Sequence, residues 1–308
     1  MAESFWTVGQ QVLVLFLLIG VGFVCGRLKL LNAGAVKCLA DVVLYVAFPC
    51  VIVQSFMRRF DPSMLRGLLA AGAAALAVHV VSILIAHLVF RDKDEARRRV
   101  LRFCTVFSNA GYMALPLQSA LLGETGVFYG AAYVAVFNLV LWSYGLVTMS
   151  GEKTGLSAKK LLLNPGVIGL AAGLLVFLLS IPVPEVVAAP IGHLAALNTP
   201  VPMLIIGFYL AKTNLPAALR DKRSYVAIGL RLVALPLLAL FGMVLCGMRG
   251  PLLISCVIAV SAPVAAASTM FATKFGQDTL LSVNLVSLST LFSVVTMPLI
   301  VAVAQFWG

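Results

Sequence analysis

Apolar stretches of about 20 residues recur along this chain, and they constrain its fold more than any other feature. A helix needs about 20 mainly apolar residues to cross the hydrocarbon core of a bilayer. The chain is 62% hydrophobic and 11% charged, whereas a soluble domain is about half apolar and about a quarter charged. The sequence therefore predicts an all-α integral membrane protein. Its ten predicted spans are Val8–Cys25, Val36–Met57, Met64–Phe90, Val100–Leu122, Gly126–Met149, Leu161–Ile181, Val186–Ala211, Tyr225–Met248, Leu252–Phe275 and Thr279–Val303.

The segments between these spans exclude several classes of function. All of them are short, so none can hold a soluble catalytic or DNA-binding domain. No glycine-rich loop ends in Lys-Ser or Lys-Thr, so ATP hydrolysis is not expected. The six cysteines lie mostly inside apolar runs without metal-ligand spacing, and we interpret them as small buried residues. We expect no metal, no bound cofactor and no nucleic-acid partner.

The basic residues predict the orientation of the chain. Of the 22 lysines and arginines, 17 lie in one set of alternate loops, four in the opposite set, and Arg231 lies inside a span. Because cytoplasmic loops carry the excess of Lys and Arg, the first set is predicted to be cytoplasmic. Both termini would then be extracytoplasmic, in the plasma (inner) membrane. The cluster Met57–Arg66 is the one misfit to this rule.

Ten spans also divide into two sets of five, residues 1–150 and 151–308. An odd number of spans inverts the second set relative to the first, as in many secondary transporters. Prolines recur at corresponding spans: Pro49 matches Pro200 and Pro202, and Pro116 matches Pro263. The fourth and ninth spans also end in similar segments, LLGETG and KFGQDT. We therefore predict two inverted five-helix repeats.

Prolines inside spans predict interrupted helices. Proline removes a backbone donor and clashes with the carbonyl four residues back, and in a membrane such irregular backbone survives only inside protein or along a cavity. Half-helix N-termini there offer free N–H groups to anions. The candidate site residues are Asn109, Gly111 and Pro116 in the fourth span and Ser261, Pro263, Ser268 and Thr269 in the ninth. The alternative is that each proline only kinks a packed helix.

Several motifs along nearly the whole chain resemble one family. They are F-S-N-A-G-Y-M-A-L-P-L (Phe107–Leu117), L-L-N-P-G (Leu162–Gly166), N-T-P-V-P followed by I-G-F-Y-L-A (Asn198–Ala211), S-A-P (Ser261–Pro263) and S-L-S-T-L-F-S with T-M-P (Ser287–Pro298). Together, in this order, they resemble the auxin efflux carrier family of membrane transporters. The short segment from Ser150 to Lys160 is similar to that of bacterial members.

The resemblance implies a fold like that of sodium/proton antiporters and bile-acid symporters, in which the fourth and ninth helices are broken and cross. Spans 1, 2, 6 and 7 would form a scaffold and dimer domain. Spans 3–5 and 8–10 would form a transport domain that moves like an elevator. Asn109, Pro116 and Pro263 would lie at the crossing, and Pro49 would line the scaffold side.

Charged residues inside a membrane are costly and indicate function by default. Two are candidates for coupling or charge compensation. Arg231 either neutralises a carboxylate or, as we favour, extends to the aqueous edge or forms a structural ion pair. Asp41 either binds a coupling cation or proton or, as we favour, pairs with Lys37 one turn earlier.

Uncharged polar residues in the spans after the predicted breaks are further candidates. Asn138 lies in the fifth span, and Asn284, Ser289 and Thr290 lie in the tenth. Each either contributes to a site or only joins helices. The three histidines have no accompanying carboxylate, so they predict no metal site.

These features predict a secondary active transporter of small organic anions, such as malonate, malate or auxin-like acids, that works by elevator-type alternating access. It would be a homodimer in the lipid bilayer, with H⁺ or Na⁺ as the coupling ion. The alternatives are a sodium-coupled symporter of bile-acid-like anions and a membrane sensor that binds a ligand without moving it. No constellation of residues predicts an enzyme.

Overall fold

The computed structural model describes residues 2–151, 165–213 and 221–307, and every regular element in these ranges is a helix. The segment from Ser150 to Lys160 and the start of the predicted sixth span lie largely outside them. The elements are α1 (Ala2–Arg27), α2 (Ala33–Val42), η1 (Val43–Ala47), α3 (Phe48–Phe56), α4 (Pro62–Val89), α5 (Glu95–Val106), η2 (Ala110–Ala114), α6 (Leu115–Val140), η3 (Leu141–Gly145), α7 (Leu146–Ser150), α9 (Pro165–Leu178), α10 (Glu185–Ala196), α11 (Pro200–Lys212), α13 (Lys222–Gly229), η5 (Leu230–Ala234), α14 (Leu235–Leu245), α15 (Gly250–Ser261), α16 (Ala267–Lys274), α17 (Thr279–Ala304) and η6 (Gln305–Trp307).

Seven continuous helical stretches among the described residues are long and apolar enough to cross a membrane. One of them, Ala110–Ser150, contains a non-helical residue, Gly123, where φ is 60° and ψ is −151°. Two more apolar helices, α9 and α15, are shorter than a full span. An all-α membrane protein is therefore confirmed, whereas the division into ten spans and two inverted repeats stays a prediction.

Three of the prolines inside spans follow a π-helical turn. Pro49, Pro116 and Pro236 each lie two residues after the end of η1, η2 and η5, respectively. The carbonyl four residues before each proline, which would clash with its ring, therefore lies inside the π-helical turn. A π-turn changes the local hydrogen-bond ladder and is frequent at functional sites. At these positions the helix widens locally and continues.

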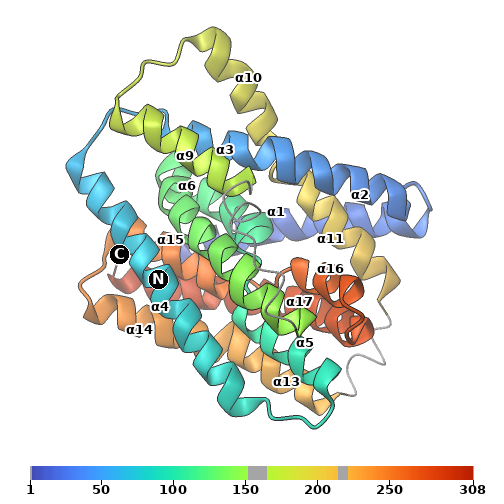
Figure 1. Cartoon of the computed structure of the whole chain (residues 1–308). Coiled ribbons are helices and arrows are strands. Elements are labelled where there is room, and N and C mark those ends of the chain that lie inside the picture. The colour runs from blue at the N-terminus through green and yellow to red at the C-terminus, as the bar shows by residue number, and fades with distance from the viewer. Residues whose placement is uncertain (1, 152–164, 214–220, 308) are drawn as a thin grey trace.

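Two groups of helices are visible in Figure 1. Helix α1 packs on α11, and α3 packs on α9 and α10. In the other group, α6 packs on α4 and α15, and α15 packs on α14 and α17. Within the first group, α1 and α11 approach at glycines: a Cβ at Gly22 would lie 2.6 Å from Leu204 Cα, and one at Gly207 would lie 2.6 Å from Phe23 N.

The second group is tied together by polar contacts across helices. The Gln118 amide donates to the Ser255 carbonyl at 2.8 Å, and the Ser255 hydroxyl donates to the Gly126 carbonyl at 2.7 Å. At the ends of α5 and α13, Arg97 donates to both carboxylate oxygens of Asp221 at 2.7 and 2.8 Å. Both bonds come from Nη2 of Arg97, and hydrogen bonds between charged groups are roughly twice as strong as those between neutral groups.

We expect the Asp221 contact to make stability depend on pH. Burial acts to raise the pKa of Asp221, but hydrogen bonds from Ser224 and Arg97 outweigh it and hold the pKa below its usual range. A carboxyl whose pKa is depressed in the folded state contributes stability above its unfolded pKa, and this is lost as pH falls through the folded value. Asp221→Asn should therefore lower the melting temperature at pH 7, and the gap to wild type should close below about pH 4. A gap that stays constant over this range would contradict the assignment.

Candidate functional site

Two helices of the second group are interrupted in the middle of the bundle. Helix α5 ends at Val106, and residues 107–109 run without helical structure before η2 begins. Helix α15 ends at Ser261, and the next helix, α16, begins at Ala267. The first break comes seven residues before Pro116, so Pro116 lies beyond it, on the far side of η2. Pro263 lies within the second break, as predicted.

The two breaks pair with each other. Ser108 and Val264 form an antiparallel β-bridge. The Asn109 N–H donates to the Pro263 carbonyl at 2.7 Å, and the Ala265 N–H donates to the Phe107 carbonyl at 2.9 Å. Each break thus satisfies backbone groups that the other leaves free, which buried backbone requires inside a membrane.

A third helix completes this arrangement. The Ser289 hydroxyl of α17 accepts a hydrogen bond from the Val264 N–H at 3.0 Å and donates to the Val286 carbonyl at 3.1 Å. Ser289 and Val264 are both fully buried. We infer a structural role for Ser289 at the crossing.

Four helix ends meet at these breaks: the C-termini of α5 and α15, and the N-termini of η2 and α16. The first N–H groups of a helix have no acceptor within it. At the start of η2, the Asn109 side chain is 5% exposed, and its amide forms no hydrogen bond with the described part of the chain. Two residues on, Gly111 faces the other group of helices, because a Cβ there would meet the Phe48 ring at 3.4 Å.

Two polar side chains of the first group lie in the neighbourhood of Tyr112. Tyr112 of η2 lies close enough to Asp41 of α2 and Tyr209 of α11 to interact electrostatically with both. Asp41 is exposed, and no ion pair with Lys37 is among the salt bridges formed by the described residues. The predicted Lys37–Asp41 pair is therefore wrong.

A cavity of about 390 Å³ opens beside α16 on the side of Lys274. Its lining comes from α11, α16, α17 and the end of the second break: Tyr209, Ala266, Thr269, Met270, Thr273, Lys274, Val283, Val286 and Ser287. The Ser287 hydroxyl also hydrogen-bonds the Thr213 hydroxyl at the end of α11, at 2.6 Å. The cavity therefore runs from the N-terminus of α16 to a lysine and lies between the two groups of helices.

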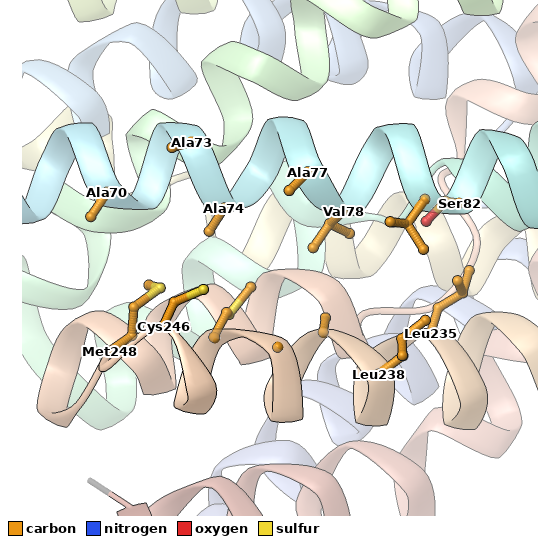
Figure 2. A pocket seen from close by; sticks show the side chains of 14 residues that line it. Ala70, Ala73, Ala74, Ala77, Val78, Ser82, Leu235, Leu238, Cys246 and Met248 are labelled. Atoms are coloured by element: carbon orange, nitrogen blue, oxygen red, sulfur yellow. The ribbon is translucent and has the colours of Figure 1, made fainter.

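A second cavity, of about 460 Å³, lies between α4 and α14. Figure 2 shows Ala70, Ala74 and Val78 on one helix opposite Leu235, Leu238 and Cys246 on the other. Ser82 is the one hydroxyl in its lining, and there is no charged side chain. Because an anion needs donors or positive charge, we do not assign substrate binding to this cavity.

Arg231 does not extend to the aqueous edge. Its side chain is fully buried, and it donates to the Thr105 and Val106 carbonyls at 3.2 and 3.1 Å and to the Val260 carbonyl. None of the salt bridges found among the described residues includes it. Our preferred interpretation of this residue, an interfacial arginine or an ion pair, is therefore wrong, because the ends of two helices enclose the guanidinium.

The remaining predicted site residues lie on five helices, α3, α6, α15, α16 and α17. Ser261 is buried at the end of α15 and bonds the Ile258 carbonyl of its own helix, and Ser268 is buried one residue inside α16. Asn138 and Thr290 bond carbonyls of their own helices, those of Val134 and Val286. Pro49 faces α9, where a Cβ at Gly169 would meet its Cα at 3.0 Å.

Three residues near this site are not among those predicted from the sequence. Tyr112 and Tyr209 lie inside the motifs S-N-A-G-Y and I-G-F-Y-L-A, and each is the one tyrosine of its motif. Lys274 was counted only as a loop cation. Its position at the end of the ninth predicted span, Leu252–Phe275, is the available signal, because that span contains the second break.

The chain matches known proteins over almost all of its length. A family model described as a membrane transport protein matches residues 7–301. An uncharacterized transporter of Methanothermobacter thermautotrophicus is 24% identical over 294 residues, which are 94% of this chain and 96% of that protein. The residues matched by the family model include both breaks and all residues that line the cavity beside α16.

Proposed function

Because the chain belongs to the membrane transport protein family, also known as the auxin efflux carrier family, we propose that it is a secondary active transporter of small organic anions. The observation that supports this most is the pairing of the two breaks. The pairing brings two half-helix N-termini and the Asn109 side chain to one region, and a cavity extends from one of these N-termini, that of α16, to Lys274. Such N-termini carry partial positive charge and donate free N–H groups to anions.

The substrate in this proposal is a mono- or dicarboxylate bound between η2, α16 and α11. The Asn109 amide supplies one donor, and Tyr112, Tyr209 and Thr269 supply hydroxyl groups. Lys274 attracts the anion into the cavity. Asp41 of α2 is the acidic residue that we propose for coupling.

Alternating access would follow from movement of one group of helices against the other. The close glycine contact of α1 with α11 stiffens the first group, which we propose as the scaffold, and the Gln118, Ser255 and Arg97 contacts stiffen the second, which we propose as the transport domain. In this proposal the ten spans form two inverted repeats, and the scaffold mediates a homodimer.

The opposite end of the bundle from Lys274 is closed by side chains from both groups. The rings of Phe56, Phe128 and Phe177 pack together, with centroids 4.5 to 6.2 Å apart. Arg58 reaches across to Glu124 at 3.5 Å. In this proposal the distribution of basic residues makes this end extracytoplasmic, and the described conformation is an inward-facing one. The cluster Met57–Arg66 departs from the charge rule at Arg58, which holds this closure.

Uptake into proteoliposomes tests the function. Purified protein is reconstituted and offered radiolabelled malonate, malate or indole-3-acetate, with and without proton and sodium gradients, against protein-free vesicles. We expect saturable uptake of at least one carboxylate, inhibited by the others. Binding of these acids without any flux would instead support a ligand sensor and overturn the proposal.

A further inference from the structure

Arg231 is the charged residue most deeply enclosed in the bundle. It lies in the π-helical turn η5, in the first third of the eighth predicted span, and has no exposed surface. A buried arginine in a membrane protein is costly unless its charge is balanced. The residues that balance it therefore indicate what it does.

Its partners are main-chain carbonyls at the ends of two helices. Thr105 and Val106 are the last two residues of α5, and Val260 is the last but one of α15. The carbonyls of a last helical turn have no intrahelical donor. No carboxylate pairs with the guanidinium in the part of the chain that the structure describes, and the side chains that interact with it electrostatically are those of His79 and Tyr133.

The charges of this arrangement balance. Each helix C-terminus carries roughly half a negative charge, so two C-termini meeting at one point carry about one. The guanidinium supplies one positive charge. Carbonyl oxygens at broken helix ends are also the ligands that coordinate coupling cations in transporters with interrupted helices.

We propose that Arg231 is a built-in counter-cation of the crossing: its guanidinium takes the place that a bound Na⁺ would otherwise fill between the C-termini of α5 and α15. Because the charge is covalently attached, the two C-termini that accept from the guanidinium stay neutralised in every state of the protein. Transport then requires no sodium at this point, a consequence that rests on the proposed function.

Thermal unfolding of purified protein in nanodiscs tests the charge without any transport assay. At fixed ionic strength, the melting temperature of the wild type should be the same in sodium chloride and choline chloride. Arg231→Ala should melt about 10 °C lower, as expected for an uncompensated buried charge. Sodium or low-millimolar guanidinium should saturably recover part of that loss. Arg231→Met, which fills the space without charge, should be destabilised and not recovered.

Arg249→Met is the matched control. Arg249 also donates to main-chain carbonyls, those of Val244 and Met248, but at an exposed helix end. Its loss should neither lower the melting temperature comparably nor create a response to cations. Saturable stabilisation of the wild type by sodium over choline would overturn the proposal. So would an Arg231→Met protein as stable as wild type. If the variants do not fold, the melting temperatures of the wild type in sodium chloride and choline chloride still test the proposal. A failure of carboxylate uptake would not change these melting temperatures.

Discussion

Gly22→Ala is expected to prevent or severely impair folding, whereas Gly20→Ala, two residues away on the same helix, is expected to be tolerated. A Cβ at Gly22 would overlap the main-chain oxygen of Leu204 and lie 2.6 Å from its Cα. A Cβ at Gly20 has nothing within 4 Å. Backbone cannot turn aside as a flexible side chain can, so α1 and α11 would have to separate.

Overpacking against side chains typically costs about 1–3 kcal/mol, and overlap with backbone should cost at least as much. The measurement is the yield of monodisperse protein on size exclusion, followed by the melting temperature of each variant. We expect Gly22→Ala to melt at least about 5 °C below Gly20→Ala. Equal melting temperatures would show that α1 and α11 do not pack as closely as described.

Asn109→Ala is expected to reduce carboxylate uptake by about 10- to 100-fold, which corresponds to losing one hydrogen bond to a charged group. The fold should survive, because the Asn109 side chain makes no hydrogen bond within the described chain and its main-chain bond to Pro263 does not depend on the side chain. The measurement is initial uptake rate against substrate concentration in proteoliposomes.

Ser293→Ala is the matched control for this variant. Ser293 is also polar and buried, but its hydroxyl bonds only the Thr290 carbonyl of its own helix. It should transport at the wild-type rate. An Asn109→Ala protein that transports as fast as Ser293→Ala would remove Asn109 from the binding site and leave the cavity beside α16 without its proposed end.

Proline positions predicted the interruptions only in part. Pro263 lies in the second break, but Pro116 lies past the first break and follows a π-helical turn. The rule that proline disturbs the preceding turn is local and holds at both places. Whether the helix breaks or only forms a π-helical turn depends on which backbone groups pair with it. The Asn109 N–H pairs with the Pro263 carbonyl, which lies on a distant segment of the chain. A single sequence does not reveal that contact.

Arg231 shows a second limit of the sequence. Its place inside an apolar span indicated that its charge had to be balanced, and this was predictable. The balancing charge is not an acidic side chain, however. It comes from the carbonyl groups at the ends of α5 and α15, which do not appear as acidic residues in the sequence. The sequence does not indicate Tyr209 for a related reason. Only the fold brings this residue of α11 to the cavity that α16 and α17 also line.

The pairing of the two breaks also affects how the protein is made. Pro263 is synthesised 154 residues after Asn109, which at about 5–20 residues per second takes about 8–30 s. During that time the Asn109 N–H and the Phe107 carbonyl have no partner in the membrane. Until the second break is synthesised, the first half of a nascent chain must therefore stay bound to the insertion machinery or have these backbone groups in contact with lipid or water. A ribosome that stalls between the two breaks would leave a fragment whose central backbone is unsatisfied, and such fragments should be prime substrates for membrane quality control.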